Sequence, residues 1–98
     1  MSMGKTICIG RVCKAKAGRG KGRYFLICEI VDADYVLLTD GDTRKADRPK
    51  RKKVRHLECR PYVAEELAEK IRAGSPLVDA EVRNTLARVK AAEESKEK

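Results

Sequence analysis

The chain has 98 residues, of which 42% are hydrophobic and 39% are charged, and its formal net charge is +8. This length suits one small domain, which buries only about 60 to 65% of its chain surface, so the hydrophobic core is modest. No apolar run approaches the roughly 20 residues that span a bilayer, and no apolar leader precedes a cleavage site, so we expect a cytoplasmic protein without a membrane partner.

The positive charge is concentrated in the first part of the chain. Residues 1–58 hold 15 basic and 7 acidic side chains, a net charge of +8, whereas residues 59–98 hold 8 of each. Within the first part, residues 44–56 carry eight basic side chains against a single acid, Asp47. This distribution favours an acidic partner, above all nucleic acid.

Residues 6–18 alternate over part of their length, which predicts a half-buried strand with Lys14 and Lys16 facing solvent. The segment GRGKG then supplies three glycines in five positions. Glycine adopts backbone angles forbidden to other residues and lets another backbone come close. We therefore predict a loop that approaches a ligand through Gly18, Gly20 and Gly22.

Residues 23–31 are aromatic, β-branched and apolar on both faces apart from Glu29, as expected for the central strand of a small barrel. The Asp-Ala-Asp of residues 32–34 predicts a turn, and residues 35–39 a third strand. The Asp-Gly-Asp of residues 40–42 predicts a second, hairpin-closing turn. Three short strands with tight turns predict a meander.

The basic run RPKRKKVRHL follows at residues 48–57. Pro49 keeps its predecessor extended and denies a sheet one donor, so residues 43–51 are predicted to be a loop or an edge. Residues 53–58 are predicted to pair as an extended segment with a bulge or to form only a short strand, because Val54 and Leu57 fall on opposite faces. Since the run lies inside the folded part of the chain, we interpret residues 48–52 as a loop, anchored by Val54 and Leu57 in the barrel, rather than as a disordered tag.

After Cys59 the apolar period becomes helical. A helix is predicted over residues 62–73, with Pro61 near its start and Gly74 past its end. A second helix follows, capped by Ser75 or Asp79. The expected apolar stripes are Ala64, Leu67, Ala68 and Ile71 on the first helix, and Val78, Val82, Leu86 and Val89 on the second. We expect both helices to pack on the barrel.

The four cysteines have irregular spacings, and we interpret them as small buried hydrophobes rather than metal ligands. They are Cys8, Cys13, Cys28 and Cys59. The only histidine, His56, lies inside the basic run and is expected to be hydrogen-bonded at the barrel rim. Without a base near a nucleophile, we predict no enzyme, no cofactor and no small-molecule substrate.

Basic side chains bind phosphates largely by releasing condensed counterions, so about five engaged cations predict a slope near −4 in log K against log salt. Base stacking needs two or three exposed aromatic residues on one face. Phe25 is expected in the core, and the three tyrosines are scattered. We therefore expect recognition of RNA backbone and shape more than of base sequence.

Residues 10–38 resemble a KOW motif through Gly10, Cys13, Ala15, Gly18, Lys21 and Gly22, followed by Phe25 and Ile27. The longer run through DGDTRKADRPKRKKVRHLE is similar to bacterial KOW-domain RNA-binding proteins related to the archaeal and eukaryotic large-subunit ribosomal protein L-fourteen-e family. The segment DAEVRNTLARV also resembles the helix that closes those bacterial proteins. The resemblance spans about residues 7–90.

This resemblance implies a mainly β fold: a small SH3-like KOW barrel over residues 7–58, followed by a two-helix extension over residues 59–92 and a frayed tail over 93–98. It implies a non-enzymatic protein that binds structured RNA, most often ribosomal, in the ribosome or its assembly. The basic candidates for RNA binding are Lys14, Lys16, Arg19, Lys21, Arg23, Arg44, Lys45, Arg48, Lys50, Arg51, Lys52, Lys53 and Arg55.

Two alternatives stay open at this point. KOW barrels of transcription-elongation proteins also contact proteins, so the chain could be a protein-binding adaptor in transcription or translation that uses the groove of its neutral helices. It could also bind nucleic acids without specificity, which competition between duplex DNA and ribosomal RNA would reveal, because contacts to 2′-hydroxyls reject DNA. The sequence leaves open whether the protein is a permanent ribosomal component or an accessory factor.

Overall fold

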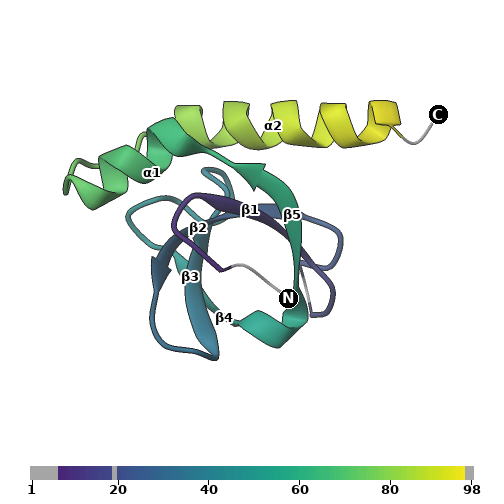
Figure 1. Ribbon diagram of the computed structural model, residues 1–98, viewed down its shortest axis with the longest axis horizontal. Helices are drawn as coiled ribbons and strands as arrows, with labels where there is room; N and C mark the ends of the chain where they lie inside the picture. The colour runs from purple at the N-terminus through teal and green to yellow at the C-terminus, as the bar shows by residue number, and fades with distance from the viewer. Residues whose placement is uncertain (1–6, 19, 97–98) are drawn as a thin grey trace.

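The computed structural model describes residues 7–18 and 20–96, and it is mainly β with helices at the C-terminal end (Figure 1). Within these residues no helix is both long and apolar enough to cross a membrane. The elements are β1 (Arg11–Ala15), β2 (Tyr24–Ile30), β3 (Tyr35–Thr39), β4 (Lys50–Lys53), the 3-10 turn η1 (Val54–His56), β5 (Leu57–Val63), α1 (Glu65–Arg72) and α2 (Asp79–Lys96).

All strand pairs are antiparallel, and the sheet order is β4-β3-β2-β1-β5. The first three strands form the predicted meander, β4 adds a fourth strand beside β3, and β5 returns to pair with β1. The sheet curls around its own interior, and both helices lie across one end of it (Figure 1). This architecture is compatible with a small SH3-like barrel and confirms the predicted fold class.

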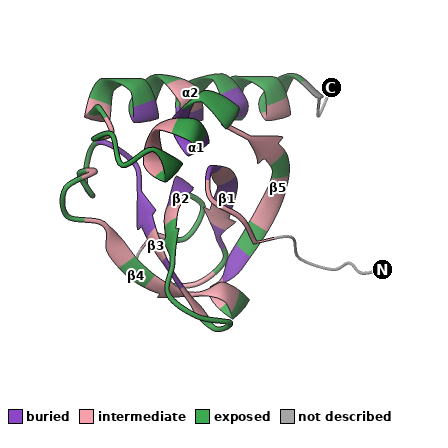
Figure 2. Cartoon of the chain, turned by 60° about the vertical axis from the view of Figure 1, so that its left-hand side comes forward, coloured by how far each residue is buried: buried purple, intermediate pink, exposed green. Residues whose placement is uncertain are grey.

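The two faces of the sheet bury separate clusters, and β2 contributes to both. Phe25 and Ile27 point into the barrel, whereas Leu26 points toward the helices. This is why the β2 sequence is apolar on both faces, as predicted. The barrel interior also holds Cys13, Ala15, Val36, Leu38 and Leu57. The layer under the helices holds Val12, Leu67, Val82, Leu86 and Val89. Figure 2 shows the buried segments of the helices and strands in purple.

The segment from residue 43 to residue 63 differs from its prediction. β4 begins at Lys50, inside the expected loop, because its main chain pairs with β3 although its four side chains are all basic. The turn η1 takes the place of the expected bulge. β5 then continues to Val63, past residue 58, so α1 begins at Glu65 rather than at residue 62.

The second helix also differs at both ends. Val78 precedes α2 and is 49% exposed, so it is not part of the apolar stripe, whereas Val82, Leu86 and Val89 are buried as predicted. The helix continues to Lys96, through much of the segment expected to fray. The reason is that Glu93 is bonded to side chains of the sheet, which holds the last turns in place.

Candidate nucleic-acid interface

Two loops hold six of the twelve basic side chains that are exposed among the described residues. The glycine loop joins β1 to β2, and residues 16–18 and 20–23 of it are described. The basic loop, residues 40–49, joins β3 to β4. Lys52 of β4 donates a hydrogen bond from Nζ to the Ala17 carbonyl oxygen at 3.1 Å, and Arg23 pairs with Asp40 at 3.6 Å. These two contacts bring the glycine loop beside both the basic loop and β4.

Two glycines of this loop make room for other side chains of the same protein. Gly18 has a φ of +86°, and a Cβ atom there would lie 2.9 Å from Lys52 Nζ. A Cβ at Gly20 would lie 3.3 Å from the Phe25 ring, whereas one at Gly22, with φ +88°, would meet nothing within 4 Å. Gly18 and Gly20 therefore allow close approach of this chain's own side chains, and an approach to RNA by the loop backbone stays a prediction.

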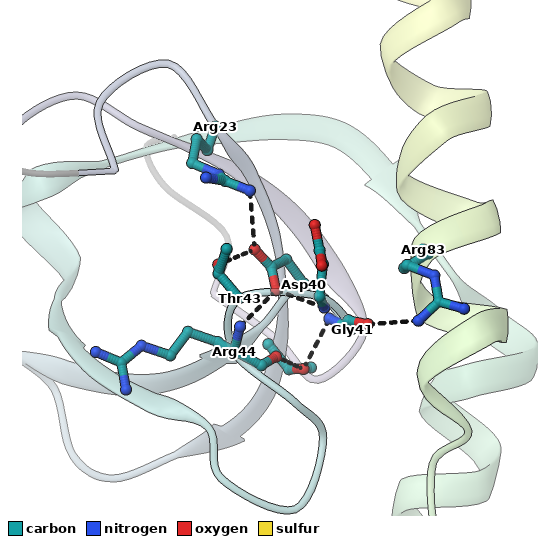
Figure 3. Close-up of polar contacts among 8 residues, drawn as sticks. Arg23, Asp40, Gly41, Thr43, Arg44 and Arg83 are labelled. Carbon is teal, nitrogen blue, oxygen red and sulfur yellow. Dashed lines mark hydrogen bonds and ion pairs between the residues drawn. The ribbon is translucent and has the colours of Figure 1, made fainter.

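The basic loop is built around the Asp40 carboxylate (Figure 3). Its oxygens accept hydrogen bonds from the Thr43 hydroxyl at 2.6 Å and from the backbone N–H groups of Asp42 and Arg44 at 2.9 and 2.8 Å. Burial alone would raise the pKa of Asp40, but these hydrogen bonds and the Arg23 charge outweigh it and lower the pKa. The loop is therefore centred on an ionised, buried carboxylate.

The start of α2 braces the same loop. Arg83 donates from Nη1 to the Gly41 carbonyl oxygen at 2.7 Å (Figure 3), and the Ala46 N–H donates to Asp79 Oδ1 at 2.7 Å. Gly41 has a φ of +74° and is buried against α2. The loop is thus fixed at two points, while Arg44, Lys45 and Arg48 remain exposed on it.

The four basic residues of β4 alternate between two faces. The pairs Leu38↔Lys50 and Val36↔Lys52 place these lysines on the side of the barrel interior. Arg51 and Lys53 lie on the outer face, where both are near the ring of Tyr35. The basic run is therefore not one uniform surface.

The candidate RNA-binding residues differ in position and in exposure. Lys14 lies apart from the loops, on the helix-covered side of β1, 5.5 Å from the centre of the Tyr24 ring. Arg23 is 49% exposed although it pairs with Asp40. Arg19 lies outside the described residues. The exposed candidates are Lys16, Lys21, Arg23, Arg44, Lys45, Arg48, Arg51 and Arg55, and the partly buried ones are Lys14, Lys50, Lys52 and Lys53.

The α2 carboxylate of Glu93 is bonded within the protein. Glu93 accepts hydrogen bonds from the Tyr24 hydroxyl at 2.6 Å and from Arg60 Nε at 2.7 Å, and Arg60 also pairs with Glu58 at 2.9 Å. Burial, together with the Glu93 carboxylate, raises the pKa of Tyr24 to about 12. Burial alone would raise the pKa of Glu93, but its bonds to Tyr24 and Arg60 lower it. This cluster fastens α2 to β2 and β5.

The cysteine prediction holds best for Cys13, which is fully buried opposite Cys59, with the two sulfur atoms 3.7 Å apart. Burial raises the pKa of the Cys13 thiol well above its ordinary value. Cys8, Cys28 and Cys59 are only partly buried. Among residues 7–18 and 20–96, no three His, Cys, Asp or Glu side chains are grouped for a metal ion.

Comparison with known proteins places the chain in a family. The large ribosomal subunit protein eL14 of Hyperthermus butylicus is 32% identical over 78 residues, which cover 80% of this chain and 72% of that protein. The chain belongs to the eL14 family. This confirms the family to which the sequence resemblance pointed.

Two further eL14 proteins align over a shorter region. The protein of Staphylothermus marinus is 38% identical over 50 residues, 51% of this chain and 52% of its own length. The protein of Aeropyrum pernix is 34% identical over 56 residues, 57% of this chain and 56% of its own length. The chain thus spans about half the length of these two relatives. No protein-family model matches the chain.

Sequence reasoning missed Tyr35 as part of this surface. The tyrosine was one of three scattered aromatic residues, and only the pairing Tyr35↔Lys53 places it under two cations of β4. Tyr35 begins one strand of the meander, and the basic run forms the next strand. This order of residues is the sequence signal that could have predicted the contact.

Proposed function

We propose that this protein is a non-enzymatic RNA-binding protein of the large ribosomal subunit or its assembly, which binds ribosomal RNA through the glycine loop, the basic loop and β4. The observation that carries the proposal is that two contacts bring these segments together. The Lys52–Ala17 hydrogen bond joins β4 to the glycine loop, and the Arg23–Asp40 ion pair joins the glycine loop to the basic loop. The eL14 family supports the ribosomal part, since its members named above are large ribosomal subunit proteins.

The physical basis is an array in which cations outnumber acids: the described residues of the two loops and β4 hold ten basic side chains against Asp40, Asp42 and Asp47. The loop cations gain free energy at phosphates through counterion release, so binding weakens steeply as salt rises. Because Asp40, Asp79 and Arg83 already hold the basic loop, little conformational entropy is lost when RNA binds. The proposed phosphate ligands are the exposed candidates of both loops and β4.

Two finer statements belong to the same proposal. The relatives reported above are archaeal proteins, so the bacterial origin that the resemblance implied stays a prediction. A cytoplasmic location accompanies the ribosomal function. The candidate set of thirteen basic residues also stays a prediction, with Lys14 the weakest member because it lies on the helix-covered side.

A protein-binding adaptor is the second candidate, and one observation favours it. A groove opens between β5, α1 and α2, with Val12, Leu67 and Val89 in its wall and Glu65 and Glu66 at its side. Ribosomal proteins are among the partners that such a groove would bind. Complexes that survive both nuclease and high salt would support this function over RNA binding.

The test compares two triple variants that each remove three positive charges. Lys21→Gln with Lys45→Gln and Arg48→Gln changes the loops, and Arg72→Gln with Arg88→Gln and Lys90→Gln changes exposed cations of the helical half. Binding to purified large-subunit ribosomal RNA is measured by filter retention between about 50 and 200 mM salt. Duplex DNA is the competitor.

We expect the loop variant to bind at least tenfold more weakly and to lower the salt slope by about two to three. The helix variant should lie within about threefold of the unmodified protein, because its cations lie outside the proposed surface. Equal losses in both variants would show that net charge alone governs binding. Duplex DNA that competes as well as ribosomal RNA would support nonspecific binding instead.

A further inference from the structure

The outer face of the sheet edge carries one aromatic ring under two cations. The Arg51 guanidinium carbon lies 4.1 Å from the centre of the Tyr35 ring, and Lys53 Nζ lies 5.9 Å from it. Tyr35 lies directly opposite Lys53 in the pairing of β3 with β4, and Arg51 lies opposite Leu37. β4 is an edge strand of the sheet.

The position of Arg51 differs from that of an ordinary phosphate-binding cation. At 4.1 Å its guanidinium is in contact with the aromatic ring, which restricts the side chain, yet the residue remains exposed. A guanidinium with one side on a ring still has a second face for stacking, and its N–H edge can donate to a phosphate. The outer face of the Arg51 guanidinium, supported beneath by the Tyr35 ring, is thus the surface available for stacking.

The surroundings fit a nucleobase followed by its phosphate. Val31, whose N–H donates to the Tyr35 carbonyl oxygen at 3.0 Å, is 44% exposed and supplies an apolar margin. Lys53 supplies a positive charge on the same face, and β4 contains four basic residues and no acid. A flat aromatic group linked to a negative charge complements this arrangement.

We propose that Arg51, held over Tyr35, stacks an unpaired nucleobase of RNA while Lys53 binds the neighbouring phosphate. The inference deepens the proposed function and rests on it. From the scattered aromatic residues we expected recognition of the RNA backbone and shape. The present inference adds recognition of an unpaired base. Tyr35 acts as a positioning residue for Arg51.

The experiment uses two RNA hairpins, one with a single bulged 2-aminopurine and one fully paired. Arg51→Lys keeps the charge but removes the plane, and Arg48→Lys makes the same change at an exposed arginine of the basic loop. Tyr35→Leu removes the ring and Tyr35→Phe keeps it. Affinity and the fluorescence of the 2-aminopurine are measured for each variant.

We expect the unmodified protein to bind the bulged hairpin at least fivefold more tightly than the paired one and to change the fluorescence of the 2-aminopurine, because the base leaves its RNA neighbours. Arg51→Lys and Tyr35→Leu should abolish most of this preference and the fluorescence change, whereas Arg48→Lys and Tyr35→Phe should keep both. Should Tyr35→Leu fail to fold, the comparison of Arg51→Lys with Arg48→Lys decides the matter.

Two results would overturn the inference, and they are distinguishable. Equal binding of both hairpins, with unchanged fluorescence, would reject base stacking while leaving phosphate binding intact. No binding of either hairpin by the unmodified protein would contradict the proposed function as well.

Discussion

Lys52 Nζ lies 3.1 Å from the Ala17 carbonyl oxygen, which joins β4 to the glycine loop across 35 positions of sequence. Gly18 makes room for this ammonium group, since a side chain there would crowd it. Lys52 therefore has a structural role, the attachment of the glycine loop to β4, although it lies in the middle of the basic run. The remaining donors of its ammonium group can still contact a phosphate.

Replacing Lys52 with methionine tests this structural role. The methionine keeps an unbranched stem but cannot donate to Ala17, so we expect a loss of about 1 kcal/mol in the free energy of unfolding. Urea denaturation measures the loss, and Lys45→Met, at an exposed position of the basic loop, is the control. Equal stability of the two variants would contradict the role assigned to Lys52.

Replacing Asp40 with asparagine tests the centre of the basic loop. The neutral amide weakens the bonds to Thr43 and the two backbone N–H groups, so we expect a loss of about 1 to 2 kcal/mol at pH 7. Because the pKa of Asp40 is lowered on folding, its contribution is present above the ordinary value of 3.8 and is lost as pH falls through the lowered pKa.

The difference in the free energy of unfolding between the unmodified protein and Asp40→Asn should therefore shrink as the solution is acidified. Urea denaturation at a series of acidic pH values measures it. Asp47→Asn, an exposed change in the same loop, is the control. A gap for Asp40→Asn that grows on acidification would be incompatible with a lowered pKa.

Gly41 and Gly22 form a matched pair for alanine substitution, with φ angles of +74° and +88°. A Cβ at Gly41 would collide with the Asp79 carbonyl oxygen and lie 3.2 Å from the Arg83 backbone nitrogen, whereas Gly22 has open space. We expect about 1 to 2 kcal/mol of destabilisation for Gly22→Ala from the backbone conformation, and at least about 3 kcal/mol for Gly41→Ala. Thermal unfolding compares them, and similar losses would mean that the basic loop moves away from α2 easily.

Replacing Tyr24 with phenylalanine tests the attachment of α2. Loss of the bond to Glu93 should cost about 1 kcal/mol at neutral pH. Because the pKa of Tyr24 is raised from 10.0 to about 12 on folding, its contribution is present below pH 10.0 and is lost as pH rises toward about 12. The absorbance difference between the two proteins should titrate near that upper value, and a titration near 10.0 would show that Tyr24 is not bonded to Glu93.

The meander and the helical character of the C-terminal part were predictable because they depend on local patterns. Apolar residues on both faces of β2, the glycine loop, and the buried Val82, Leu86 and Val89 follow directly from residue order. The basic strand was not predictable in the same way. Lys50–Lys53 has no apolar alternation, and only its main-chain bonds to β3 make it a strand.

The boundary between β5 and α1 shows a second limit. Pro61 suggested the start of a helix, yet β1 pairs with β5 as far as Val63, and this pairing delays the helix to Glu65. Residues that are far apart in sequence decided this boundary, since Arg11 lies opposite Val63. Local propensity is a weak guide wherever a strand partner competes for the backbone.

The class of fold, the placement of the excess charge and the family resemblance could be inferred from residue order alone, because composition and short-range periodicity carry these properties. The role of each basic residue became clear only in the folded chain. Lys52 bonds to the glycine loop, Arg23 pairs with Asp40, and Arg51 lies over Tyr35. The physical reason is that a side chain's role depends on the atoms that pairing and packing bring beside it, and those atoms belong to distant segments of the chain.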